Sequence, residues 1–116
     1  ILDTLESFRM FTKLNPAPEV VGIALAPYHL QPRKVPVVDA IRACGKKLLF
    51  FYAWQKGRCT AQFTGHGPAD LKPWMEALAE QKYAHWMTPF MHGELPVDEM
   101  AAAVTKARNY LEPMRF

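Results

Sequence analysis

Three apolar runs, separated by helix-like segments, constrain the fold of this chain more than any other feature. They cover residues 20–26, 47–54 and 83–90, and each is followed directly by polar residues. The first run is rich in Val, Ile and Leu without alternation, which is typical of a strand buried on both faces. We therefore expect three strands whose carboxyl ends carry polar groups.

Helix-like sequence fills the spaces between these runs. Apolar residues recur at helical spacing from Leu2 to Asn15-Pro16, where the residue before proline is pushed out of the α region. Further helices are expected over residues 37–44, which Gly45 ends, over about 69–81, and from about residue 96 onward. The resulting α-β-α-β-α-β-α order predicts an α/β protein with a parallel sheet and right-handed crossovers.

Composition excludes several classes of protein. Half of the 116 residues are hydrophobic and 22% are charged, which favours a globular domain over disorder. The net charge of +3 is small and dispersed, so we expect no nucleic-acid partner. The apolar runs are too short for a membrane span and no secretory signal is present, so we expect no membrane association. Cys44 and Cys59 form no CxxC and no metal-ligand spacing, which favours reduced thiols in a cytoplasmic protein.

The carboxyl ends of the three expected strands predict one shared site. In α/β proteins the loops and the helix N-termini converge at this edge of the sheet. His29, Gln55 and His92 come just after the three runs. We interpret His29 and His92 as candidate catalytic groups, because imidazole exchanges protons near neutral pH. The alternative for each is a structural histidine, and for Gln55 it is a capping role.

Candidate substrate-binding residues surround these three. Tyr52 or Trp54 can stack on the apolar face of a sugar ring, and Gln55 can hydrogen-bond a hydroxyl. Arg33, Lys56 and Arg58 lie in loops at the same expected edge, where cations complement a phosphate or a sugar acid. Their alternative interpretation is as solvated loop charges.

Several segments resemble a known family. The stretch Gly65-His66-Gly67-Pro68-Ala69-Asp70-Leu71, followed by Trp74, Leu78 and Tyr83, resembles a recurrent passage of the sugar phosphate isomerase/epimerase family. The ending from Pro96 to Tyr110-Leu111 resembles the closing helix of the same proteins. Residues 21–29 resemble the family strand that carries an aspartate and, three residues later, a histidine. The family has xylose isomerase-like TIM barrels, so the resemblance implies the C-terminal part of a (β/α)8 barrel.

The resemblance covers nearly all of the chain, which begins inside a helix and without an initiator Met. We therefore expect residues 1–116 to form a single partial domain, the C-terminal half of a barrel. Its open sheet would require either a missing N-terminal half or a second copy of the chain as partner.

The resemblance also implies a function. Family members move a proton beside the carbonyl of a small sugar, assisted by a divalent metal ion such as Mn, Mg, Co or Zn, which stabilises the enediolate oxygens. His29 matches the family histidine, whereas the carboxylate positions fall on Ala26 and near Phe90. The metal ligands that the resemblance implies here are His29, Gln55 and His92, and the expected partner is a small carbohydrate.

Two other functions stay open. Loss of the carboxylates favours a non-catalytic barrel that binds a carbohydrate or a protein. Abasic-site endonucleases share the barrel architecture, but they need more carboxylate and histidine ligands and a stronger basic face. Bound metal, sugar turnover and cleavage of abasic DNA distinguish the three functions.

Overall fold

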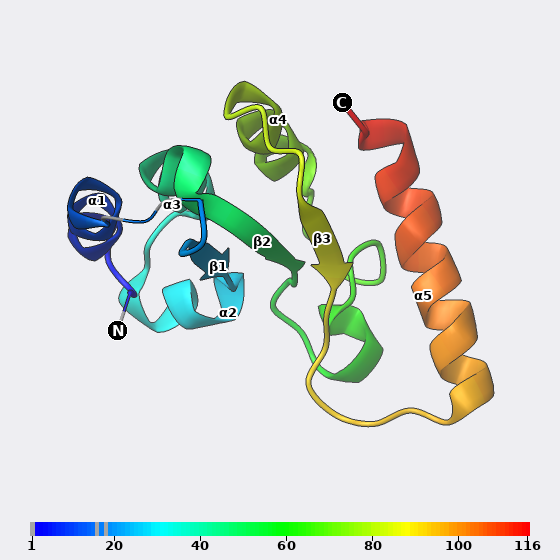
Figure 1. Cartoon of the computed structure of the whole chain (residues 1–116). Coiled ribbons are helices and arrows are strands. Elements are labelled where there is room, and N and C mark those ends of the chain that lie inside the picture. Colours follow the sequence, from blue (N-terminus) through cyan, green and yellow to red (C-terminus); the bar gives the residue numbers. More distant parts are fainter. Residues whose placement is uncertain (1, 16, 18) are drawn as a thin grey trace.

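The computed structural model describes residues 2–15, 17 and 19–116, and the expectations that involve Ile1, Pro16 and Pro18 lie outside these residues. Five α-helices and three strands alternate along the described residues (Figure 1). In chain order they are α1 (Leu5–Leu14), β1 (Ile23–Leu25), α2 (Pro27–Leu30), α3 (Val37–Cys44), β2 (Leu48–Ala53), α4 (Lys72–Glu80), β3 (Trp86–Pro89) and α5 (Val97–Leu111). The predicted alternation of helices and strands is confirmed, with the addition of the short helix α2.

The sheet is parallel and its strand order follows the chain, β1-β2-β3. Phe50 of β2 pairs with Ala24 on one side and with Trp86 on the other. The predicted α/β class with a parallel sheet is therefore confirmed. The strands are shorter than predicted, because Val20 belongs to a turn closed by its N–H donating to the carbonyl of Ala17.

The hydrophobic core lies on one face of this sheet. Phe51 and Leu25 point into it and are almost completely buried, as are Ile41 of α3 and Leu78 of α4. Leu111 of α5 belongs to the same cluster, so helices from both ends of the chain cover this face.

The opposite face of the sheet is uncovered in the described chain. Residues of all three strands share this surface, which we call the open face: Ala24, Phe50, Tyr52, Trp86 and Thr88. Trp86 has 80% of its surface exposed, and Ala24 and Thr88 are also exposed. The expectation that the first strand is buried on both faces was wrong, because no described helix packs against Ala24.

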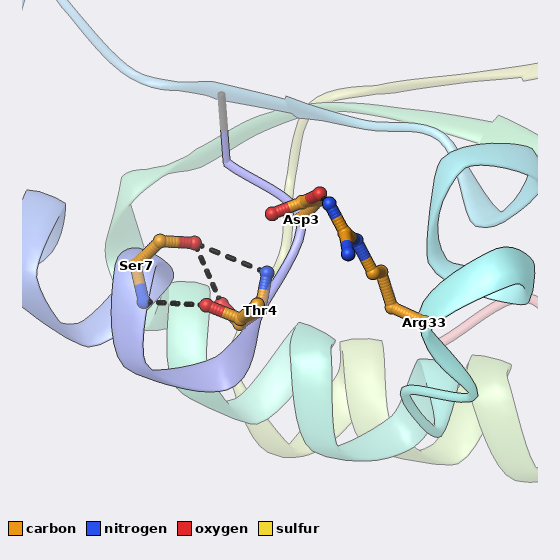
Figure 2. Close-up of polar contacts among 4 residues, drawn as sticks. All are labelled: Asp3, Thr4, Ser7 and Arg33. Carbon is orange, nitrogen blue, oxygen red and sulfur yellow. Dashed lines mark hydrogen bonds and ion pairs between the residues drawn. The ribbon is translucent and has the colours of Figure 1, made fainter.

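The beginning of α1 is held by two sets of polar contacts (Figure 2). Thr4 and Ser7 form a capping box, in which each side-chain oxygen accepts a hydrogen bond from the other residue's backbone N–H at 3.1 Å. Such a cap satisfies donors that the first helical turn leaves unpaired, so α1 begins at Leu5 and not at the first residues. Next to the cap, Nε of Arg33 donates to Oδ2 of Asp3 at 2.8 Å and ties the helix start to the turn after α2.

The thiol of Cys44 is buried at the end of α3, and burial raises its pKa from 9.0 to about 12. Above pH 9 the unfolded chain loses a proton that the folded chain keeps, so stability falls as the pH rises toward 12. We expect the free energy of unfolding to drop about 2 kcal/mol more between pH 8 and about pH 10.5 than it does in Cys44→Ala. Urea denaturation of both proteins at the two pH values measures this difference, and an identical pH dependence would contradict it.

Candidate functional site

A small cleft opens at the carboxyl edge of the sheet. It has a volume of about 210 Å³ and is lined by Ala26, Tyr28, His29, Tyr52, Phe90 and His92. These residues follow β1, belong to β2, and follow β3, as expected for a shared site at the ends of parallel strands. The structure thus brings His29 and His92 to the same cleft.

Helix α2 positions Tyr28 and His29. It begins at Pro27, whose fixed φ suits the first turn of a helix. The backbone N–H of His29 donates to the carbonyl of Ala26 at 3.0 Å, so the chain turns sharply as β1 ends. This single helical turn holds His29 at the cleft directly after the strand, where the sequence predicts it.

Tyr28 lies at the centre of a group of aromatic rings. Its ring centroid is 5.3 Å from that of His29, 4.3 Å from that of His92 and 5.3 Å from that of Trp54. Phe90 contacts the ring of His92 from another side, at 4.9 Å. Edge-to-face and tilted packing of this kind holds rings in defined positions and leaves other ring surfaces free for a ligand.

The cleft also contains two phenolic hydroxyls. Within the described residues, the hydroxyls of Tyr28 and Tyr52 have no hydrogen-bond partner in the protein, and 42% of the surface of Tyr28 is exposed. Each hydroxyl can donate one hydrogen bond and accept others. The arrangement therefore offers aromatic surface, two hydroxyls and two imidazoles to a small polar molecule.

Trp54 is not among the residues that line the cleft, but it packs behind one of them, Tyr28. Only 5% of its surface is exposed, and its Nε1–H donates to Oε1 of Gln62 at 3.0 Å. Its ring packs edge-on against Tyr28. We therefore replace the predicted contact between Trp54 and a substrate with an indirect role, in which Trp54 orients the ring of Tyr28.

Gln55 is buried and its amide is engaged by the backbone. Its Nε2 donates to the carbonyl of Phe63, and its Oε1 accepts from the N–H of Ala69 at 3.0 Å. A Cβ atom on Gly67 would lie 2.8 Å from the amide carbon of Gln55, so glycine permits this close packing. The structure favours the structural alternative for Gln55 over binding of a metal or a substrate.

The Gly65-His66-Gly67 turn also has a packing explanation. Gly65 has φ of +77°, and a Cβ atom there would lie 2.7 Å from the Cβ of Tyr110. Nε2 of His66 lies 3.0 Å from the carbonyl oxygen of Ala103, a geometry in which the ring N–H donates to α5. These contacts join the long loop after β2 to α5, and they account for both glycines without a bound anion.

The predicted cationic residues do not line the cleft as the structure describes it. Arg33 pairs with Asp3, and 62% of its side chain is exposed. Lys56 and Arg58 are exposed in the turn that precedes the 3-10 helix Cys59–Gln62. For all three residues the alternative of solvated charge fits the structure better than contact with a bound oxyanion.

The residues present do not form a complete metal site. Among the described residues, no group of three or more His, Cys, Asp or Glu side chains lies close enough to hold a metal ion. The cleft itself supplies two imidazoles, and Ala26 lies at a position where the resemblance of the sequence implies a carboxylate. A typical catalytic zinc has three protein ligands, so a metal here would need donors beyond this cleft.

Gln62 is the residue that sequence reasoning missed. Besides Trp54, its Oε1 accepts the backbone N–H of His92 at 2.7 Å, and it thereby connects the loop after β2 to the loop after β3. A single glutamine inside a long loop has no periodicity or motif that would have distinguished it.

No protein-family model matches the chain, and no curated protein matches it. Among the described residues, none of the helices is both long enough and apolar enough to cross a bilayer.

Proposed function

We propose that this chain forms part of a TIM barrel. The strand order of the sheet follows the chain, and the helices that contribute to the core lie on one face. Each connection between strands therefore advances in the same direction along the sheet. Doubly wound sheets reverse direction at a switch point and place helices on both faces. In a closed barrel the open face would become the interior, which is filled with side chains. The aromatic character of Phe50, Tyr52 and Trp86 supports this proposal.

Where no further strands close the barrel, the open face stays exposed, and we propose that a second copy of this chain then covers it. An exposed tryptophan amid other apolar side chains is typical of residues that dominate binding energy. We expect the wild-type chain to self-associate at micromolar concentration, and Trp86→Lys to weaken the association at least about tenfold. Val97→Lys is the control, because Val97 is 87% exposed but lies at the start of α5. Sedimentation velocity measures the association, and a monomeric wild-type chain would refute it.

For the cleft we propose an isomerase or epimerase activity on a small sugar or sugar derivative. The observation that carries this proposal is the placement of two imidazoles beside Tyr28 at the carboxyl edge of a parallel sheet. Imidazole is the side chain best suited to remove and return a proton near neutral pH. The proposal agrees with the family resemblance of the sequence.

The proposed reaction is internally balanced. An imidazole takes the proton from the carbon next to the carbonyl, and the C–H electron pair forms the C=C bond of an enediolate. The carbonyl oxygen gains the negative charge, which a hydroxyl of Tyr28 or Tyr52 can stabilise by donating a hydrogen bond. For the isomer, a proton returns to the former carbonyl carbon while the hydroxyl proton of the other enediolate oxygen passes to the former carbonyl oxygen, so the carbonyl moves to the neighbouring carbon. For the epimer, a second group, such as the other imidazole, delivers a proton to the opposite face of the original carbon and the original C=O bond re-forms. The reaction needs no oxidant and no second substrate.

Solvent exchange tests this proposal directly. The chain is incubated in D₂O with a panel of aldoses, ketoses and their phosphates, and proton NMR follows the carbon-bound hydrogens beside each carbonyl. We expect deuterium to enter one of these positions in at least one sugar. Binding of sugars without exchange would overturn the catalytic proposal, and absence of both would overturn any role in sugar chemistry.

Binding without exchange would support the second candidate, a non-catalytic carbohydrate-binding protein. Its specific support is that no carboxylate lines the cleft among the residues that the structure describes, whereas the resemblance implies carboxylates at Ala26 and near Phe90. The aromatic rings and free hydroxyls would serve such a binding role unchanged.

A further inference from the structure

The side-chain amide of Gln62 has one possible orientation in this structure. Its Nε2 donates to the carbonyl of Gly57 at 3.2 Å, while its Oε1 accepts from Nε1–H of Trp54 at 3.0 Å and from the backbone N–H of His92 at 2.7 Å. The reversed amide would place an NH₂ group against two N–H donors and an oxygen against a carbonyl oxygen. The three contacts therefore fix which atom of Gln62 faces His92.

The atom that faces His92 is an oxygen that can only accept hydrogen bonds. Nδ1 of His92 lies 3.2 Å from it. If Nδ1 carried no hydrogen, its lone pair would oppose those of the amide oxygen at this distance. With a hydrogen on Nδ1 the contact becomes a hydrogen bond, and the neutral ring then carries its lone pair on Nε2.

We propose that Gln62 is a positioning residue that holds His92 in the Nδ1–H tautomer and so makes its Nε2 the proton acceptor of the cleft. The role in proton transfer rests on the proposed function, whereas the tautomer itself does not. In the reaction Nε2 takes the carbon-bound proton, the ring becomes an imidazolium, and Nδ1–H continues to donate to Gln62. The imidazolium exchanges this proton with solvent in a fraction of turnovers before Nε2 returns a proton to the substrate, which is how deuterium enters the sugar.

The second histidine of the cleft provides an internal comparison. His29 packs edge-on against Tyr28 with ring centroids 5.3 Å apart, and within the described residues its ring nitrogens have no hydrogen-bond partner in the protein. A histidine ring in water prefers the Nε2–H tautomer. The two histidines are therefore expected to differ in tautomer, although they share one cleft and both are exposed.

Nitrogen-15 NMR of the whole chain tests the proposal, at an alkaline pH above which the ring signals no longer change. The spectrum distinguishes protonated from unprotonated ring nitrogens, and the His92→Gln variant assigns the signals of His92. We expect His92 as Nδ1–H and His29 mainly as Nε2–H. Finding His92 mainly as Nε2–H in the wild-type chain would overturn the proposal.

Two substitutions at Gln62 separate positioning from folding. Gln62→Leu removes the acceptor, and we expect the tautomer ratio of His92 to move about tenfold toward Nε2–H, as the loss of one hydrogen bond predicts. Gln62→Glu keeps an acceptor oxygen, and we expect it to retain the Nδ1–H form even if loss of the donor to Gly57 loosens the loop. Gln81→Leu, at the end of α4, is the matched control and should leave the ratio unchanged.

The same samples distinguish failure of the positioning role from failure of the proposed function. Nδ1–H in the wild-type chain without deuterium exchange into any sugar would refute the proposed function but support the tautomer assignment. Exchange that continues at the wild-type rate in Gln62→Leu would refute the positioning role while supporting the activity.

Discussion

Replacing Phe51 by alanine is expected to lower the free energy of unfolding by about 3–5 kcal/mol. Phe51 lies in the central strand β2, between Leu25 and Met87 in register, and none of its surface is exposed. Its ring packs edge-on against Trp74 of α4, with centroids 6.2 Å apart. Alanine would remove this contact and leave a cavity that backbone on both sides keeps from closing. Because domains of this size have about 5–15 kcal/mol of total stability, the variant should be close to unfolding.

Phe50→Ala is the matched control, because Phe50 is the preceding residue of the same strand and points to the open face. It is only partly buried and contacts the ring of Tyr52 at 4.8 Å. We expect its substitution to cost about 1 kcal/mol or less at protein concentrations too low for self-association through the open face. Urea denaturation of both variants, followed by circular dichroism, gives the comparison. Equal losses would contradict a sheet with one covered and one uncovered face.

The helices could be predicted from the sequence because local chemistry determines their ends. The helix predicted over residues 37–44 is confirmed residue for residue as α3, since Gly45 follows it with φ of +52°, which other residues rarely adopt. Asn15 after α1 has an extended backbone with ψ of 110°, as expected for a residue that precedes proline. Neither boundary depends on contacts distant in sequence.

The environment of the strands could not be predicted in the same way. The apolar composition of residues 20–26 indicates a strand, but it does not indicate which of its residues face the helices. Leu25 points to the covered face and is buried, whereas Ala24 points to the open face and is exposed. The covered face is the one on which the connecting helices cross from strand to strand, and the residues of β1 do not determine it. The same limit explains why the first strand was expected to be buried on both faces.

The location of the candidate site could be predicted from the sequence, but the roles of its individual residues could not. The rule that parallel strands gather polar groups at their carboxyl ends placed His29 and His92 in one cleft. Gln55 follows β2 just as directly, yet the Gly67 turn packs on it and its amide bonds to backbone groups of Phe63 and Ala69. Pairings between residues 8 to 14 positions apart in irregular loops decide these roles, and no local pattern predicts them.

Substitution of His92 is the change expected to affect the proposed activity most. We expect His92→Gln to slow deuterium exchange into the substrate at least about 100-fold, because general-base catalysis contributes about 10²–10⁴-fold and glutamine cannot accept a proton at neutral pH. Sugar affinity should change little, since Tyr28, Tyr52 and Phe90 still line the cleft. Exchange followed by NMR and affinity measured by calorimetry separate the two effects.

His85→Gln is the control, because His85 is an exposed histidine that packs against Tyr83 ahead of β3, outside the lining of the cleft. It should exchange at the wild-type rate. His29→Gln distinguishes two schemes. A loss similar to that of His92→Gln indicates that both histidines of the cleft transfer protons. If His29→Gln exchanges at the wild-type rate, Nε2 of His92 carries out both proton steps. The proton must then leave and re-enter on the same face of the substrate. Full exchange activity in His92→Gln would leave His29 as the proton acceptor and would refute the assignment of this role to His92.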